Sequence, residues 1–478
     1  MNLDNMVVGR DLSEIKNKIK KIFFYRICGT GMGACACLAK EAGFDVAGAD
    51  LTFSPPMSNY LETLDIPLFK LADVTKEKLS EFDLIVVGNS VPRKSDYAKF
   101  VEESGVRFTS FPSFLGEFLL KEKEVIGVCG THGKTTTTFF LTQMLENLGL
   151  EPGYFIGGII EGRAPSKLGI DKYFVIEADE YDSAYFQKIS KFRLYELDHM
   201  ILTSLEFDHA DIFNSIEDIK NEFASTIPSL KGEIVANDEY EAILDLKEKF
   251  NEKSWSIYGV KTDSGPVKIE TNSKVTRFSI MLGNSFVDFE TSVIGTHNIL
   301  NICSCLVLLH KKGFNTLELK QSVKKLGLVK RRQELRGKYK NSLVIDDFAH
   351  HPKAISLTID AIRNSYPDKK IVTVFEPISA TARSNIFQKE FEDSLVESDS
   401  VVIAMNSIST TVEDSKNLNC ELLVDNLNNR KISSSLVSSL AELRSEIDIK
   451  DSEETLFLIL SNRTCLGLWE SDFVDQIS

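Results

Sequence analysis

A glycine-rich stretch that runs into lysine and threonine has the residue types and spacing that point most directly to chemistry. It consists of Gly130, Thr131, His132, Gly133, Lys134, Thr135 and Thr136. Residues 125–128 predict a buried strand before it, and the apolar spacing of residues 137–148 predicts a helix after it. Backbone N–H groups of such a turn converge at the positive end of a helix dipole, where lysine and a threonine hydroxyl can hold phosphates and Mg²⁺. The stretch therefore predicts an ATP-binding phosphate loop, although Val128 replaces the first glycine of the strict motif, and we expect Lys134 to project from a solvent-open turn.

Acidic residues follow two further predicted strands. Residues 173–176 lead into Glu177 and an acidic turn, and residues 200–203 lead into a stretch that holds three carboxylates and His209. Acids at strand ends beside a phosphate loop are where nucleoside triphosphatases hold Mg²⁺. The first turn alone fits a solvated acidic turn equally well, but a neutral imidazole at His209 can complete the shell of a second ion. We therefore expect Thr135, Glu177 and His209 to bind Mg²⁺.

Two later stretches carry groups that suit the rest of a nucleotide. Asn298 stands at a predicted helix start, where it fits an N-cap as well as a partner for an adenine edge. Arg332 lies in a basic turn and either is solvated or neutralises phosphate charge. Asp347 and His350 follow a predicted strand at 343–345, at the edge where open α/β sheets gather ligands.

A second glycine turn near the N-terminus consists of Gly29, Thr30, Gly31, Met32 and Gly33. It joins a predicted strand at 22–27 to a helix that ends near residue 42, and the next predicted strand, 46–50, ends in Asp50. This βαβ pattern predicts a parallel sheet with a nucleotide-type site at its C-terminal edge. A tight structural turn is the alternative, because Arg26 stands where a fuller fingerprint has glycine.

Strand and helix patterns alternate along most of the chain and predict an α/β protein with three domains. We place these domains at residues 1–118, 119–333 and 334–478. Alternation over residues 267–293 predicts antiparallel strands, whereas the Asn- and Ser-rich residues 414–439 predict exposed loops. The last domain has four predicted strands, at 343–345, 371–375, 401–403 and 456–460.

Composition describes an ordinary globular protein of 478 residues, 43% hydrophobic and 26% charged. The formal charge of −15 argues against a nucleic-acid or anionic membrane surface as partner. No apolar run reaches transmembrane length, the N-terminus lacks a signal-peptide pattern, and the eight cysteines lack metal or disulfide spacing. We therefore expect a cytoplasmic protein with reduced cysteines; the sequence carries no signal for an oligomeric state.

Taken in order, these motifs resemble the Mur ligase family, ATP-dependent amide-forming enzymes of bacterial cell-wall synthesis, over essentially the whole chain. The resemblance implies an N-terminal Rossmann-like domain, a central phosphate-loop ATPase domain and a C-terminal Rossmann-like domain that closes over the nucleotide. It implies that ATP and Mg²⁺ are used to make an acyl phosphate, with Lys134, Glu177 and His209 as catalytic residues. Carried over onto this sequence, the family's nucleotide site comprises the phosphate loop with Asn298, Arg332 and Asp347, and its substrate sites comprise residues 29–33, Asp50, Asn89, His350 and Arg383.

Two branches of that family use UDP-N-acetylmuramate as acyl donor, and they differ in the acceptor. Residues 180–186 and 205–213 resemble the branch that adds the tripeptide L-Ala-γ-D-Glu-meso-diaminopimelate in peptidoglycan recycling. Ile378 and Ala380 depart from that branch, which usually has Arg and Asn there, while Arg383 keeps its place as an anchor for a peptide carboxylate. The resemblance thus implies a tripeptide ligase, with the L-alanine ligase of de novo peptidoglycan synthesis as the alternative.

Two other function classes stay open from the residues alone. A dinucleotide-dependent oxidoreductase would use the first βαβ unit with Asp50 as ribose ligand, but it leaves the phosphate loop without a role. A non-catalytic nucleotide-binding regulator would fit the altered Ile378 and Ala380. ADP release that depends on a muramyl substrate separates an enzyme from such a binder.

Overall fold

The structure, a computed structural model, describes residues 3–158, 160, 162–207, 213, 215–271, 275–379, 382–405 and 417–478. The chain divides into two compact units. The first comprises Met1–Glu206, Ser215–Gly265 and Asn301–Val323, and the second comprises Phe207–Asn214, Pro266–Leu300 and Lys324–Ser478. The three domain ranges stated above stay predictions.

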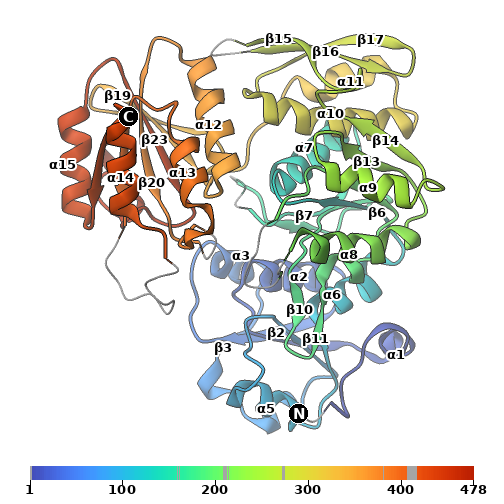
Figure 1. The fold of residues 1–478 in the computed structure, drawn as a ribbon. Helices are drawn as coiled ribbons and strands as arrows, with labels where there is room; N and C mark the ends of the chain where they lie inside the picture. Colours follow the sequence, from blue (N-terminus) through green and yellow to red (C-terminus); the bar gives the residue numbers. More distant parts are fainter. Residues whose placement is uncertain are drawn as a thin grey trace. The chain divides into compact units, whose positions relative to one another are not determined.

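The N-terminal part of the first unit is a five-stranded parallel sheet of order β3-β2-β1-β4-β5. Figure 1 labels two of its strands, β2 and β3. Its strands are β1 (Lys21–Tyr25), β2 (Asp45–Asp50), β3 (Leu68–Lys70), β4 (Leu84–Val87) and β5 (Phe108–Ser110). Its helices are α2 (Thr30–Glu41), α3 (Met57–Thr63), α4 (Lys76–Leu79) and α5 (Asp96–Glu102), and α1 (Gly9–Ile15) precedes β1. The strand order reverses between β1 and β4, so the turn after β1 lies at a topological switch point, where such sheets bind ligands.

The same unit holds a seven-stranded sheet of order β14-β13-β12-β6-β9-β7-β8, in which only the β7–β8 pair is antiparallel. Its strands are β6 (Glu124–Cys129), β7 (Gly153–Phe155), β8 (Ser166–Lys167), β9 (Tyr173–Glu177), β12 (His199–Leu202), β13 (Ile234–Asn237) and β14 (Trp255–Tyr258). Its helices are α7 (Lys134–Asn147), α8 (Ile216–Thr226), α9 (Glu241–Lys249) and α11 (Thr316–Val323). Helix α6 (Phe111–Phe114) continues as a π-helical segment, Leu115–Leu120, and connects the two sheets.

A hairpin of β10 (Asp182–Ala184) and β11 (Gln187–Ser190) joins the central sheet to the N-terminal one. Tyr185 and Phe186 at its tip pack into the apolar core of the N-terminal sheet, and the Tyr185 hydroxyl donates to the Ala98 carbonyl over 3.4 Å. The hydroxyl of Ser110 donates to Gln187 Oε1 over 2.6 Å. These contacts hold the segment after β9 against the sheet that carries the N-terminal glycine turn.

The second unit contains a three-stranded antiparallel sheet and a six-stranded sheet of order β18-β19-β23-β20-β21-β22. The first has β15 (Val267–Thr271), β16 (Thr276–Leu282) and β17 (Ser285–Thr291); the second has β18 (Glu334–Tyr339), β19 (Ser342–Asp347), β20 (Lys370–Glu376), β21 (Ser400–Ala404), β22 (Ser433–Val437) and β23 (Thr455–Ser461). Its helices are α12 (Pro352–Ser365), α13 (Gln388–Ser394), α14 (Cys420–Asn429) and α15 (Leu440–Lys450). Apolar cores cover both faces of the six-stranded sheet. Helix α10 (Thr296–Lys311) begins in this unit and continues in the first.

The α/β class with parallel sheets is confirmed, as are the antiparallel strands over residues 267–293. The prediction of exposed loops over residues 414–439 is wrong in the described part, where α14 and β22 lie. Cys420, Leu423 and Leu427 form a buried helical face that frequent asparagines conceal in the sequence, and the Asn419 side chain caps the helix. Among the helices that the structure describes, none is long and apolar enough to cross a membrane.

Candidate nucleotide and substrate sites

The phosphate loop turns sharply between β6 and α7 because two of its glycines adopt left-handed backbone angles. Gly130 has φ 127° and Gly133 has φ 83°. A Cβ on Gly130 would lie 2.5 Å from the Thr203 hydroxyl and 2.6 Å from the Ser204 carbonyl, and one on Gly133 would lie 2.9 Å from Asn301 Oδ1. Only glycine fits both positions, so the backbone N–H groups of the loop can converge at the start of α7.

The segment after β12 clamps this loop. The His132 N–H donates to the Ser204 hydroxyl over 2.7 Å, and the Thr203 hydroxyl donates to the Cys129 carbonyl over 3.0 Å. The Glu206 N–H donates to the Thr131 hydroxyl over 2.9 Å, and the Glu206 carboxylate lies 3.3 Å from His132 Nε2. From its sequence, this segment was predicted only to lead into metal ligands, and its role in holding the loop could not be predicted because its partners are distant in the chain.

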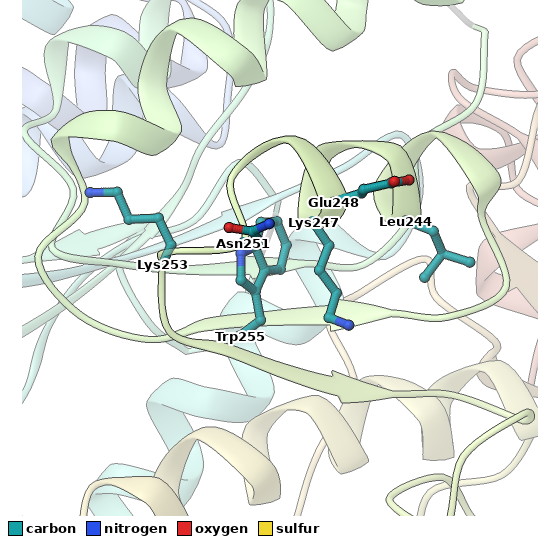
Figure 2. A pocket seen from close by; sticks show the side chains of 6 residues that line it. All are labelled: Leu244, Lys247, Glu248, Asn251, Lys253 and Trp255. Carbon is teal, nitrogen blue, oxygen red and sulfur yellow. The ribbon is translucent and has the colours of Figure 1, made fainter.

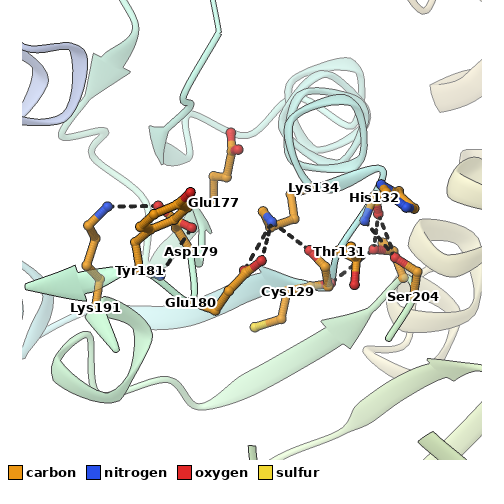
Figure 3. Close-up of polar contacts among 12 residues, drawn as sticks. Cys129, Thr131, His132, Lys134, Glu177, Asp179, Glu180, Tyr181, Lys191 and Ser204 are labelled. Carbon is orange, nitrogen blue, oxygen red and sulfur yellow. Dashed lines mark hydrogen bonds and ion pairs between the residues drawn. The ribbon is translucent and has the colours of Figure 1, made fainter. Parts of the chain in front are cut away.

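Lys134 is largely covered rather than solvent-open, so the expectation of a solvent-open lysine is wrong. Its Nζ donates to the Gly130 carbonyl over 2.7 Å and to the two oxygens of Glu180 over 3.1 and 3.2 Å (Figure 3). The side chains of Lys134 and Glu180 are 12% and 4% exposed. Burial alone would lower the pKa of Lys134, but neighbouring carboxylates, Glu180 foremost, raise it above its ordinary value. The ammonium is therefore a permanent cation within the site.

Glu177 ends β9 beside the phosphate loop. Its carboxylate accepts the Thr135 hydroxyl over 2.8 Å and the Gly157 N–H over 2.8 Å, and burial raises its pKa. The Thr135 and Glu177 oxygens are hard donors of the kind that Mg²⁺ prefers, so the pair fits the predicted ion. Among the described residues, no group of three or more His, Cys, Asp or Glu side chains forms a complete metal cluster. His209 lies outside the described residues, and its role stays a prediction.

The N-terminal glycine turn leaves the start of α2 open. Gly29 caps this helix without a side-chain hydrogen bond, and both Gly29 and Thr30 are exposed. A Cβ on Gly31 would lie 3.3 Å from the ring of Phe111, whereas one on Gly33 would lie 2.2 Å from the sulfur of Met57. The free N–H groups at this end are suited to an anionic group of a substrate.

Asp50 is 4% exposed and organises this turn. Its carboxylate accepts the N–H groups of Cys28 and Leu51 over 2.8 and 2.7 Å and pairs with Arg26 Nε over 2.8 Å. Arg26 itself has φ 71°, a strained value for a side chain at the position where the fuller fingerprint has glycine. Asn89, another predicted substrate residue, donates to the Asp182 carbonyl at the base of the hairpin over 3.4 Å.

In the second unit, Gln333 brings two predicted nucleotide residues together. Its side-chain oxygen accepts from Asn298 Nδ2 over 3.2 Å, its Nε2 lies 3.2 Å from His297 Nε2, and its backbone N–H donates to Asp347 over 2.7 Å. Asn298 also donates to the Ile294 carbonyl over 2.9 Å, so its amide is engaged within the unit. No sequence pattern marks Gln333, because a glutamine in a basic turn carries no spacing signal.

The remaining predicted site residues of this unit are Arg332, His350 and Arg383. The Arg332 guanidinium lies 4.9 Å from the centre of the Phe348 ring, and His350 Nδ1 lies 3.0 Å from the Phe348 carbonyl. Arg383 is half-buried, and its Nε has no hydrogen-bond partner among the described residues. Ala380 lies outside the described residues. The roles of Arg332, His350 and Arg383 in binding nucleotide or acceptor stay predictions.

The Gln333 network predicts that acidification destabilises the second unit. Gln333 Nε2 can only donate, so His297 Nε2 must be neutral to accept it. Burial, together with the Arg332 charge, lowers the pKa of His297 from 6.5 to about 4. Between these two values the unfolded chain binds a proton that the folded one does not, so stability falls as pH falls, by on the order of 3 kcal/mol. Thermal unfolding midpoints from pH 7 to 4 should fall less in His297→Gln than in the unaltered protein, and equal falls would contradict a neutral His297.

A hollow on the surface of the first unit lies apart from these predicted residues. Figure 2 shows its lining, which consists of Leu244, Lys247, Glu248, Asn251, Lys253 and Trp255. The Trp255 indole N–H donates to the Phe250 carbonyl over 2.9 Å, so this ring supports the end of α9. We assign no site to this hollow.

A lysine-bearing phosphate loop beside a strand-end carboxylate is the arrangement of an ATP-binding enzyme. The same unit holds a doubly wound sheet with an open glycine turn. Three family models match consecutive parts of the chain: "Mur ligase family, catalytic domain" at residues 21–123, "Mur ligase middle domain" at 128–309 and "Mur ligase, glutamate ligase domain" at 331–463. The chain belongs to the Mur ligase family. It is therefore an ATP-dependent ligase that forms C–N bonds, which confirms the predicted enzyme class and three-domain architecture and sets aside the oxidoreductase alternative.

Relatives with both acceptor types match along most of the chain. The UDP-N-acetylmuramate–L-alanyl-γ-D-glutamyl-meso-2,6-diaminoheptandioate ligase of Haemophilus influenzae is 34% identical, over 84% of this chain and 89% of its own. The UDP-N-acetylmuramate–L-alanine ligase of Lactococcus lactis subsp. cremoris SK11 is 31% identical, over 85% and 88%. Among solved structures, a murein peptide ligase of Psychrobacter arcticus matches with a TM-score of 0.69 at 28% identity, over 96% of this chain and 98% of its own.

Proposed function

We propose that this chain joins L-Ala-γ-D-Glu-meso-diaminopimelate to UDP-N-acetylmuramate in peptidoglycan recycling. The observation that carries the proposal is the 34% identity to a ligase named for these substrates, over 84% of the chain. The resemblance of residues 180–186 to the tripeptide branch supports it as well. An L-alanine ligase is the second candidate, supported by the 31% identity to the Lactococcus relative. A cytoplasmic location stays a prediction from the sequence.

The first step makes an acyl phosphate. An oxygen of the donor's lactyl carboxylate attacks the γ-phosphorus of ATP, the bond from that phosphorus to the β–γ bridging oxygen breaks, and ADP leaves. Lys134 and the N–H groups of the phosphate loop hold the phosphates, and their positive charge offsets the repulsion between the carboxylate and the polyphosphate. Thr135 and Glu177 would hold Mg²⁺, which supplies further neutralisation of phosphate charge when bound.

The second step makes the amide. The amine of the acceptor's L-alanine attacks the acyl carbon, the tetrahedral intermediate loses inorganic phosphate, and the nitrogen loses its proton. We assign adenosine and phosphate contacts to Asn298, Arg332 and Asp347, and acceptor contacts to His350 and Arg383. The open turn of residues 29–33, with Asp50 and Asn89, is assigned to the UDP-linked donor.

The acceptor preference tests this proposal. With ATP, Mg²⁺ and UDP-N-acetylmuramate, kcat/KM measured by ADP release should be much higher for the tripeptide than for L-alanine. A site that accommodates a tripeptide gives free alanine few contacts, so its amine is poorly positioned for attack. Ile378 and Ala380 offer no polar group to the peptide's carboxylates, so we expect a raised KM for the tripeptide. A higher kcat/KM for L-alanine would replace the proposal with the alanine-ligase alternative.

A further inference from the structure

Lys191 is a nearly buried cation that the mechanism above does not use. It begins a short 3-10 helix, Lys191–Leu194, directly after β11, and its side chain is 13% exposed. Its Nζ donates to Asp179 Oδ2 over 2.8 Å (Figure 3). The same Nζ lies 5.6 Å from the centre of the Tyr181 ring and 5.9 Å from that of Phe111. The ammonium is therefore shielded from water by two rings and held by one carboxylate.

These contacts place Lys191 beside the turn assigned to the donor. The Phe111 ring that faces its Nζ is also the ring that a Cβ on Gly31 would approach to 3.3 Å. Through Lys191, the acidic segment of residues 177–180 and the start of α2 thus share the Phe111 ring as a neighbour.

On its other side, the acidic segment reaches the phosphate loop. Glu177 accepts the Thr135 hydroxyl, and Glu180 holds Lys134. With the donor assigned to the turn of residues 29–33 and ATP to the phosphate loop, the donor's carboxylate meets the γ-phosphate beside this segment, which carries three carboxylates. An anion that approaches them in a partly dehydrated space is repelled unless a cation accompanies it. Lys134 is paired with Glu180 and assigned to the phosphates of ATP, so the donor's carboxylate needs a second cation.

We propose that Lys191 contacts the lactyl carboxylate of the acyl donor and directs it toward the γ-phosphate, and that Asp179 is its partner when the donor is absent. The inference rests on the proposed function, since it requires a donor that carries a carboxylate. An ammonium has three N–H groups, so Lys191 can keep Asp179 while it binds the incoming carboxylate. Asp179 and the two rings then fix the direction in which that contact is made.

Steady-state kinetics of Lys191→Met test the proposal. The variant should lower kcat/KM for UDP-N-acetylmuramate by roughly 10- to 100-fold, as expected for the loss of a hydrogen bond between charged groups, mainly through a raised donor KM. Binding of a non-hydrolysable ATP analogue without donor should stay unchanged, and Lys191→Arg should recover part of the loss. Lys188→Met is the matched control, because Lys188 lies on the same hairpin, is 58% exposed and pairs with Asp182.

Asp179→Asn separates a donor contact from a merely structural ion pair. If Lys191 served only to hold Asp179, the two single variants would raise the donor KM equally, and that result would overturn the proposal. We expect Asp179→Asn to change the donor KM by no more than about 3-fold, because it keeps the ammonium. The double variant removes both charges and leaves neither buried alone, so it should match Lys191→Met in donor KM even where that single variant is unstable.

ADP release by the unaltered protein shows whether a failed test concerns Lys191 alone or the proposed function as well. Absence of muramate-dependent ADP release from it would overturn both. Normal release from it, together with an unchanged donor KM in Lys191→Met, would overturn the role of Lys191 alone.

Discussion

Lys134→Ala should lower ADP release by on the order of 10³-fold or more, because it removes the cation that faces the transferred phosphoryl group. The same change should also lower stability. Glu180 is 4% exposed and would stay buried without its cation, which costs about 3–5 kcal/mol. Turnover and the thermal unfolding midpoint, measured on the same preparation, report the two effects. Near-normal turnover in Lys134→Ala would show that the phosphate loop is only a structural turn.

A second substitution separates these effects. Lys134→Met combined with Glu180→Gln removes both charges and keeps the side-chain volumes, so the unfolding midpoint should return toward that of the unaltered protein while turnover stays lost. If turnover returned together with stability, the loss in Lys134→Ala would come from unfolding rather than from a missing phosphate contact.

Glu177→Gln should cut turnover by several orders of magnitude and raise the Mg²⁺ concentration needed for half-maximal activity, since an amide is a poorer ligand for a hard cation than a carboxylate. The fold should survive, because the glutamine oxygen can still accept from Thr135 or Gly157. Mg²⁺ titrations of turnover measure the effect. Glu151→Gln is the control, since Glu151 is 57% exposed and pairs with Lys167. An unchanged Mg²⁺ requirement in Glu177→Gln would remove Glu177 from the ion site.

The elements that could be predicted from the sequence are those whose physical constraint is local. Strands β6 and β23 are buried on both faces of a parallel sheet, so they form unbroken apolar runs. The phosphate loop was predictable because its glycines, lysine and following helix are contiguous in the chain. Helix α14 was missed because its apolar face is only three residues wide among asparagines.

The partners of the site residues could not be predicted, because they come from distant parts of the chain. Lys134 and Glu180 are 46 residues apart, and His132 and Ser204 are 72 apart. Gln333 reaches Asn298 from 35 residues away. No local sequence pattern predicts which buried carboxylate pairs with which cation, because the pairing depends on how the strands are arranged in the sheet. The sequence indicated the reacting groups, and the structure adds the groups that hold them.

One competition experiment tests the central claim most directly. The protein is given ATP, Mg²⁺, UDP-N-acetylmuramate and equal concentrations of the tripeptide and L-alanine, and the products are identified by mass spectrometry. We predict that UDP-N-acetylmuramyl-tripeptide accumulates in step with ADP and that little UDP-N-acetylmuramyl-alanine forms. Predominant formation of UDP-N-acetylmuramyl-alanine, or ADP release without any amide product, would contradict the account.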